Sequence, residues 1–204
     1  GASYGGRRVG SWGQAGTFSF YPTKNLGAYG DGGAVITDDT EIAKRLRRLR
    51  QYGWGAERIS EQKGINSRMD ELQAAILRVK LADLDYSNAR RLELANLYRL
   101  RLVGTSYKLP VFCADSEPVY HNFVIRHPKR DALRHFLNEQ GIATLVHYPV
   151  PIHLQKGYLD LGYPAGCFPQ TELASNEVLS LPLYPEMTIE MIEQVCQSLL
   201  AFPG

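Results

Sequence analysis

Residues 18–27 read Phe-Ser-Phe-Tyr-Pro-Thr-Lys-Asn-Leu-Gly, and this stretch decides the fold and the chemistry that we expect of the chain. Alternating aromatic and small polar residues over 17–21 predict a short strand, which Pro22 ends. The side chain of a free lysine has a pKa of about 10.4, so a lysine becomes a nucleophile at neutral pH only when it is desolvated or converted to an imine. The stretch alone fits either a surface cation in a glycine-rich loop or a nucleophile in a closed site. It is not a Walker phosphate loop, because the required Gly before Lys24 and Ser or Thr after it are absent.

Outward from this loop, the chain alternates predicted strands and helices. Residues 34–37 predict a buried strand, and residues 40–51 predict a helix with one apolar and one basic face, ended by Gly53. A capping-box-like start at Ser67 opens a helical pattern that runs to about Leu102. Because this pattern is longer than most helices of globular proteins, we expect it to be bent and to bridge two domains. The remaining expected strands are at 120–126 and 142–146, and the remaining expected helices are at 130–140, 170–178 and 188–201. Residues 179–181 lie between the last two helices. This alternation is typical of a small α/β domain.

Composition narrows the class of protein. The chain has 204 residues, of which 44% are hydrophobic, so it has enough apolar side chains for a substantial core. Its 23 basic and 21 acidic side chains leave a net charge of only +2, which argues against a nucleic-acid partner. Three widely spaced cysteines argue against a disulfide framework and fit a reducing cytoplasm. With neither a signal-peptide pattern nor a membrane-spanning apolar stretch, we expect a soluble cytoplasmic protein.

Residues 64–75, Gly-Ile-Asn-Ser-Arg-Met-Asp-Glu-Leu-Gln-Ala-Ala, form a second informative stretch. Asn66 and Arg68 are its polar positions ahead of the helical pattern. A helix N-terminus and a neighbouring side-chain amide both favour a bound anion. The alternative is a plain N-cap, in which Asn or Ser precedes an amphipathic helix, and these residues alone leave both interpretations open.

Residues 147–153, His-Tyr-Pro-Val-Pro-Ile-His, form a third stretch. The spacing of His147 and His153 raises the possibility of a metal site. Two histidines without a nearby Cys or carboxylate ligand make zinc a poor fit, so no metal is predicted. Other histidines of the chain are interpreted as ordinary surface or core residues.

Together these three stretches resemble the DegT/DnrJ/EryC1/StrS family of sugar aminotransferases, which depend on pyridoxal phosphate. The family pattern has a serine at the end of a strand, a lysine five residues later, Asn-Leu after it and a Gly-Gly turn before the next strand. Ser19, Lys24 and Gly32-Gly33 match it. The resemblance implies that Lys24 forms the Schiff base with pyridoxal 5'-phosphate and that Ser19 donates its hydroxyl to the cofactor phosphate. A hydroxyl on a rigid strand is a suitable donor to a phosphate dianion.

The same resemblance assigns roles to the second and third stretches. Asn66 is expected to reach the cofactor phosphate of a second subunit, which implies a homodimer with active sites at its interface. Arg68 is expected to approach the substrate. His147, Tyr148 and His153 are expected to contact the sugar nucleotide.

The fold that the resemblance implies is the α/β, aspartate-aminotransferase-like fold of type I pyridoxal-phosphate enzymes. Residues 1–85 would be part of the large cofactor domain, with a parallel or mixed sheet, and residues 86–204 the small C-terminal α/β domain, joined by a long bent helix. The matching region is the latter half of a family member. We therefore expect a truncated or fragmentary chain that exposes apolar sheet surface and is inactive alone, because the family places the aspartate that pairs with the pyridine nitrogen upstream of Gly1.

The implied reaction belongs to aminosugar biosynthesis. An amino acid, by family analogy glutamate, gives its amino group to a nucleotide-linked keto-sugar, and the variants around Lys24 and His147 resemble those of enzymes acting at C3. One alternative is a non-catalytic fragment or regulatory module of the same family. Another is a cofactor-dependent sugar dehydratase, which Lys24 disfavours because the relatives of that class have histidine at this position.

Overall fold

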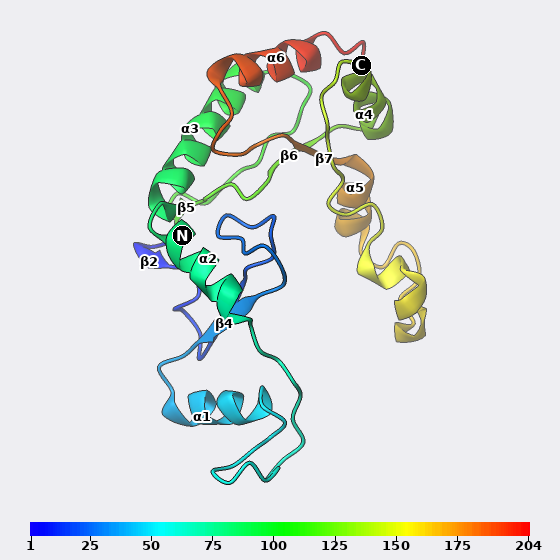
Figure 1. The fold of residues 1–204 in the computed structure, drawn as a ribbon. Helices are drawn as coiled ribbons and strands as arrows, with labels where there is room; N and C mark the ends of the chain where they lie inside the picture. Colours follow the sequence, from blue (N-terminus) through cyan, green and yellow to red (C-terminus); the bar gives the residue numbers. More distant parts are fainter. The chain divides into compact units, whose positions relative to one another are not determined.

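The structure, a computed structural model, describes all residues from 1 to 204 and contains two compact units (Figure 1). Unit 1 consists of residues 1–89 and 113–119, and unit 2 of residues 90–112 and 120–204. Helix α3 (Leu84–Leu102) carries the chain from one unit into the other. The predicted domains, 1–85 and 86–204, stay a prediction.

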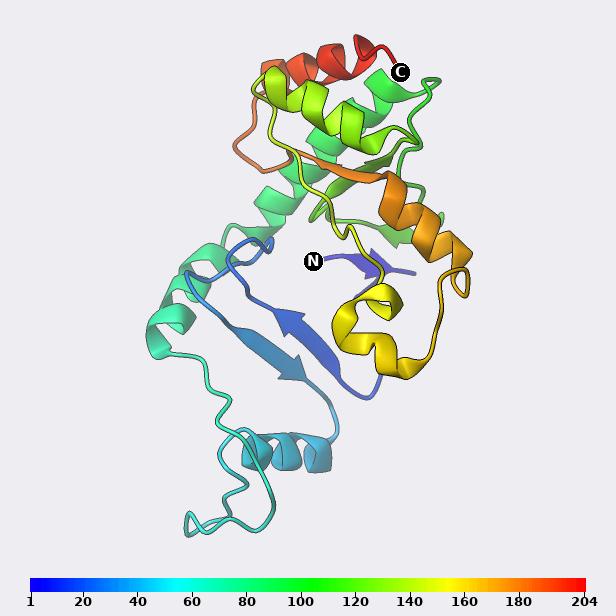
Figure 2. The same ribbon diagram turned by 90° about the vertical axis from the view of Figure 1, so that its right-hand side faces the viewer.

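A hairpin of two antiparallel strands forms the sheet that leads into the Lys24 loop. Strand β3 (Gly16–Ser19) pairs with β4 (Gly33–Ile36), with Ser19 opposite Gly33, and Figure 2 shows the two side by side. Residues 34–37 were expected to be buried, but the side chains of Val35 and Ile36 are exposed. The expectation of exposed apolar sheet surface is confirmed at these residues.

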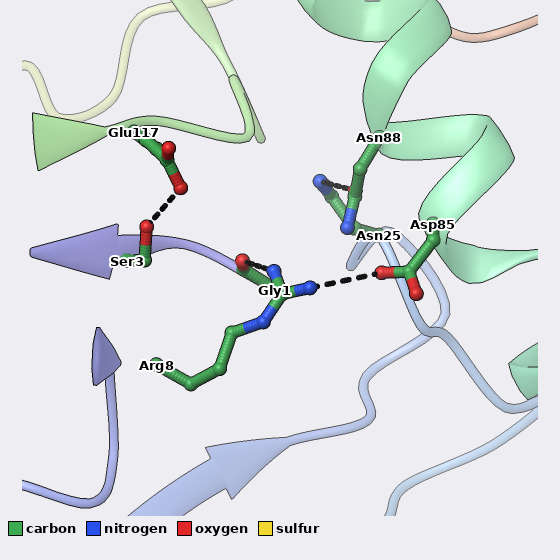
Figure 3. A network of polar contacts seen from close by, with 7 residues as sticks. All are labelled: Gly1, Ser3, Arg8, Asn25, Asp85, Asn88 and Glu117. Carbon is green, nitrogen blue, oxygen red and sulfur yellow. Dashed lines mark hydrogen bonds and ion pairs between the residues drawn. The ribbon is translucent and has the colours of Figure 1, made fainter. Parts of the chain in front are cut away.

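Unit 1 contains a second small sheet, which has three strands. Strand β1 (Ser3–Tyr4) pairs with β2 (Arg7–Arg8) and with β5 (Ser116–Glu117), and both pairings are antiparallel. The hydroxyl of Ser3 donates to the carboxylate of Glu117 (Figure 3). Every strand pairing in the chain is antiparallel, so the parallel strands of a doubly wound sheet are not among these residues.

The helix predicted at residues 40–51 is present, whereas the helical pattern that follows Ser67 differs from the prediction in two details. Helix α1 (Thr40–Leu49) is capped by the carboxylate of Asp39, which accepts hydrogen bonds from two first-turn amides. The capping box at Ser67 was wrong, because helix α2 (Glu71–Leu81) begins four residues later with Asp70 at its N-cap and no side-chain cap bond. The single bent helix is two helices: the amides of Ala82 and Asp83 donate three residues back, a tight pattern that ends α2 before α3 begins.

Unit 2 packs helices against a two-stranded antiparallel sheet. Strand β6 (Phe123–Arg126) pairs with β7 (Val178–Leu181), and helix α4 (Arg130–Glu139) contacts both β7 and helix α6 (Ile189–Leu200) (Figure 2). The predicted strand 142–146 was wrong, since only Leu145 bridges to Ser180. The prolines at 149 and 151 have no amide hydrogen with which to continue such a ladder. The helices of this unit, besides most of α3, are α4 (Arg130–Glu139), η1 (Ile152–Leu154), η2 (Lys156–Leu161), α5 (Pro169–Glu177) and α6 (Ile189–Leu200).

The core of unit 2 lies between α3, the sheet, α4 and α6. Tyr98 of α3 is fully buried, its ring lies 4.9 Å from that of Phe123, and its hydroxyl donates to the carbonyl of Pro182 at 2.9 Å. Burial raises the pKa of Tyr98, and it raises the pKa of the Cys196 thiol to about 12. None of the helices combines the length and the apolar composition that crossing a bilayer requires.

Arg91 is a buried cation at the edge of this core. Its side chain is 8% exposed, and Nη1 donates to the carbonyl oxygens of Leu183 at 2.8 Å and Tyr120 at 3.3 Å. Desolvation lowers the pKa of its guanidinium. Arg91 therefore joins helix α3 to two loops through carbonyl groups that have little access to water.

We predict that Arg91→Met lowers the free energy of unfolding by roughly 2–4 kcal/mol, because two buried carbonyls lose their donor. Urea unfolding measures this change. Arg99→Met, on an exposed position of the same helix, is the matched control and should change stability by less than about 0.5 kcal/mol. Equal effects for the two variants would show that the Arg91 bonds do not stabilise the core.

His127 follows β6 and is buried between the rings of Tyr107 and Phe202. Its Nδ1 accepts from the amide of Lys129 at 3.1 Å. Desolvation, followed by the charge of Lys129, lowers its pKa below the ordinary value. The folded state thus binds this proton less readily than the unfolded state.

The free energy of unfolding should therefore fall as the pH drops below about 6.5, because His127 is protonated at a higher pH in the unfolded chain than in the folded one. His127→Gln should flatten the dependence of the unfolding free energy on pH in this window. His135→Gln, on the surface of α4, is the control and leaves the slope due to His127 in place. An unchanged slope in His127→Gln would contradict the assignment.

Candidate functional site

The loop between β3 and β4 holds Lys24 in a tight, hydrogen-bonded turn. The amide of Lys24 donates to the carbonyl of Tyr21 at 2.9 Å, and the amide of Ala28 donates to the carbonyl of Phe20 at 2.8 Å. Gly27 makes this closure possible, because a Cβ at that position would lie 2.4 Å from the carbonyl oxygen of Pro22. The backbone from which the Lys24 side chain extends is thus held by hydrogen bonds within the loop.

Ser19 stands at the end of β3, five residues before Lys24. Its Oγ accepts from the amide of Tyr21 at 3.3 Å, and a hydroxyl that accepts one hydrogen bond can still donate its own hydrogen. Ser19 is exposed and Lys24 half-buried, so solutes have access to both side chains. An amine and a hydroxyl donor on one short loop are a donor set that fits an aldehyde-bearing phosphate ester.

Three polar side chains from α2 and α3 fasten the part of the loop that follows Lys24. Asn88 accepts from Nδ2 of Asn25 at 2.8 Å, as Figure 3 shows. Gln73 accepts from the amide of Tyr29 at 2.8 Å, and Lys80 donates to the carbonyl of Gly27 at 2.5 Å. Sequence reasoning did not single out Gln73, Lys80 or Asn88. The one available signal was the seven-residue spacing of Gln73 and Lys80, which places them on one face of α2, whereas Asn88 lies on the separate helix α3.

Asn66 and Arg68 form one exposed pair. Nε of Arg68 donates to Oδ1 of Asn66 at 2.9 Å, and the guanidinium lies 6.0 Å from the centre of the Tyr52 ring. Because the amide oxygen of Asn66 already accepts from Arg68, most of the groups that this pair offers a ligand are N–H donors. Such a pair suits an anion, in line with the predicted role at a phosphate or a sugar nucleotide.

Arg68 also lines a pocket of about 1110 Å³ within unit 1. Residues of β3, β4 and α1 form its walls, together with the segment before α2. Arg47 and Arg50 line it as well. The pocket therefore combines apolar strand surface with three guanidinium groups.

His147 and Tyr148 lie together in unit 2. Nδ1 of His147 is 2.8 Å from Oγ of the buried Ser180, which fixes the orientation of the ring, and the Tyr148 side chain is exposed. The two rings meet edge to face at 5.5 Å. His147 keeps Nε2 for another partner, as a substrate contact requires.

His153 has different surroundings. It is 7% exposed, and its Nε2 is 3.0 Å from the carboxylate of Glu172. That carboxylate also accepts from the amides of Gly166 and Phe168, and these hydrogen bonds, with that of Gly166 the largest contribution, lower the pKa of Glu172. A role for His153 at the substrate stays a prediction, and its Nδ1 is the ring nitrogen left for it.

The predicted residues thus form three local sets: Ser19 with Lys24, Asn66 with Arg68, and His147 with Tyr148. No group of three or more His, Cys, Asp or Glu side chains in the chain is arranged to hold a metal ion.

Comparison with known proteins connects this geometry to a family. The sequence profile of the DegT/DnrJ/EryC1/StrS aminotransferase family matches residues 1–200. The chain is 50% identical over 188 residues to the dTDP-3-amino-3,4,6-trideoxy-alpha-D-glucose transaminase of Streptomyces venezuelae, an alignment that covers 92% of this chain and 50% of that protein. It is 46% identical over 205 residues to a pleiotropic regulatory protein of Geobacillus stearothermophilus, covering 99% of this chain and 55% of that protein.

Solved structures agree with the sequence comparison. The chain superposes on S. venezuelae DesV in complex with a ketimine intermediate with a TM-score of 0.94 and 48% identity, covering 98% of this chain and 54% of that one. The predicted fold class is thereby confirmed. The chain spans about half the length of the curated relatives it matches. It belongs to the DegT/DnrJ/EryC1/StrS aminotransferase family.

Proposed function

We propose that this chain is part of a pyridoxal-phosphate-dependent enzyme that transfers an amino group from an amino acid, glutamate, to a nucleotide-linked keto-sugar. The observation that carries the proposal is the loop that places Lys24 five residues beyond the Ser19 hydroxyl in a tight turn. Bound pyridoxal phosphate would supply an aldehyde for the amine and an electron sink for the bond changes at the amino-acid carbon.

The residues of the chain then have distinct tasks. The amine of Lys24 holds the cofactor and, once an amino-acid donor displaces it, accepts and returns a proton at Nζ. Ser19 donates to the phosphate. In a homodimer, the donors of Asn66 add to that phosphate from the second subunit, and Arg68 attracts the diphosphate of the nucleotide sugar. His147 and Tyr148 orient the sugar.

The position of amination follows from the sequence motifs and from the relatives. The S. venezuelae transaminase that is 50% identical is named for a 3-amino sugar. We therefore propose C3 as the carbon that receives the amino group, and we place the enzyme in the cytoplasm as a homodimer, where its three free cysteines stay reduced.

A second candidate function is regulation. It is favoured by the 46% identity to a protein named as a pleiotropic regulator. In that case the chain would act through binding to a partner, and amino transfer would be dispensable.

The first prediction from this proposal concerns Lys24. In the full-length enzyme, Lys24→Ala should remove the absorption band of the bound cofactor and reduce amino transfer by roughly 10³-fold or more, because no other amine replaces both roles. Absorbance spectra and a coupled glutamate assay measure the two effects. Lys63→Ala, at an exposed position outside the loop, is the control. A wild-type protein that shows no such band would favour the regulatory candidate.

The second prediction concerns the substrate. Offered 3-keto and 4-keto nucleotide sugars with glutamate, the enzyme should aminate the 3-keto compound at least about tenfold faster in kcat/KM, a difference of roughly 1.4 kcal/mol in transition-state binding. Product NMR identifies the aminated carbon. Preferential amination at C4 would refute the assignment to C3 and leave the role of Lys24 intact.

A further inference from the structure

A buried pair of amide side chains adjoins Lys24. Asn25, the next residue, donates from Nδ2 to Oδ1 of Asn88 at 2.8 Å (Figure 3). The same nitrogen donates to the carbonyl of Val119 at 2.9 Å. Asn88 lies in the first turns of α3 and is only 7% exposed. Both hydrogens of the Asn25 amide group are therefore committed, and the peptide that follows Lys24 is fixed to α3.

The pair is not explained by stability alone. Oδ1 of Asn25 and Nδ2 of Asn88 are buried and have no hydrogen-bond partner in the chain. A buried polar atom without a partner costs about 1–3 kcal/mol, so two such atoms cost more than the roughly 0.5–1.5 kcal/mol that the Asn25–Asn88 bond contributes. An apolar pair would fill this place at lower cost but would not fix the direction of the loop.

Among the contacts that fasten the loop, this pair is the nearest to Lys24. Gln73 and Lys80 bind the backbone at Tyr29 and Gly27, farther along the chain. On the other side of Lys24, its own amide donates to the carbonyl of Tyr21. The Lys24 backbone is thus held between an internal turn bond and the Asn25–Asn88 pair, and release of that pair leaves Asn25 held only by its bond to the carbonyl of Val119.

We propose that Asn88 is a positioning residue for Lys24, which acts through Asn25 to set the direction in which the lysine amine leaves the loop. The proposal rests on the proposed function of Lys24. Asn88 itself touches neither substrate nor cofactor. Its effect is seen in the reactivity of Lys24 and in cofactor affinity.

Two substitutions in the full-length enzyme separate positioning from stability. Asn88→Leu removes the acceptor at similar volume and also removes one unsatisfied atom, so the melting temperature should stay close to that of the wild type. Asn88→Asp keeps an acceptor for Asn25 but buries a charge, so it should melt at a lower temperature. If Asn88 positions Lys24, the reactivity of Lys24 should change in Asn88→Leu, although this variant is more stable than Asn88→Asp.

The first readout uses the apoenzyme. Competitive acylation with acetic anhydride across a pH series, followed by peptide mass spectrometry, gives the reactivity of Lys24 relative to the exposed Lys63. The second readout is the dissociation constant of pyridoxal phosphate. Asn88→Leu should change the relative reactivity of Lys24 and weaken cofactor binding about tenfold. Asn88→Asp should match the wild type in both.

Each outcome has a definite meaning. If Asn88→Leu binds the cofactor and labels at Lys24 like the wild type, Asn88 is not a positioning residue and the proposal is overturned, while the proposed function stands. If the wild-type enzyme does not bind pyridoxal phosphate through Lys24, the proposed function fails and this inference fails with it. If Asn88→Leu does not fold, Asn88→Ser, which is too short to accept from Asn25, takes its place under the same criteria.

Discussion

The attachment of one loop to two helices is the constraint on which the site in unit 1 depends. Side chains of α2 and α3 accept from or donate to the loop at Asn25, Gly27 and Tyr29. The hydrogen bonds from the helices therefore fix the backbone from which the Lys24 side chain extends.

What could be predicted from sequence was local. Lys24, Ser19, Asn66 and Arg68 lie in contiguous stretches whose residue types carry their chemistry, and the hairpin around Lys24 follows from its aromatic alternation and glycines. Gln73, Lys80 and Asn88 were missed, because their bonds to the loop span 44, 53 and 63 residues. The spacing of Gln73 and Lys80 indicates a shared helix face but not the loop that they contact.

The errors in secondary structure have local causes. Nothing in the composition of residues 67–102 indicates a break. The amides of Ala82 and Asp83 nevertheless donate to carbonyls three residues earlier, and these bonds divide the predicted helix. Residues 142–146 have the apolar character of a strand, but the proline-rich segment after them limits pairing to a single bridge. Local hydrogen bonds decided the first place and prolines the second, whereas the burial of His153 depends on a contact with Glu172, 19 residues away.

The central claim is that the Lys24 amine of this loop holds the cofactor. It is tested most directly by borohydride reduction of the full-length wild-type enzyme loaded with pyridoxal phosphate, followed by peptide mapping with mass spectrometry. Reduction makes any lysine–cofactor link permanent, so the mass of one pyridoxyl phosphate group should appear on the peptide that contains Lys24 and on no other lysine. A modification confined to a different lysine, or none at all, would contradict the account.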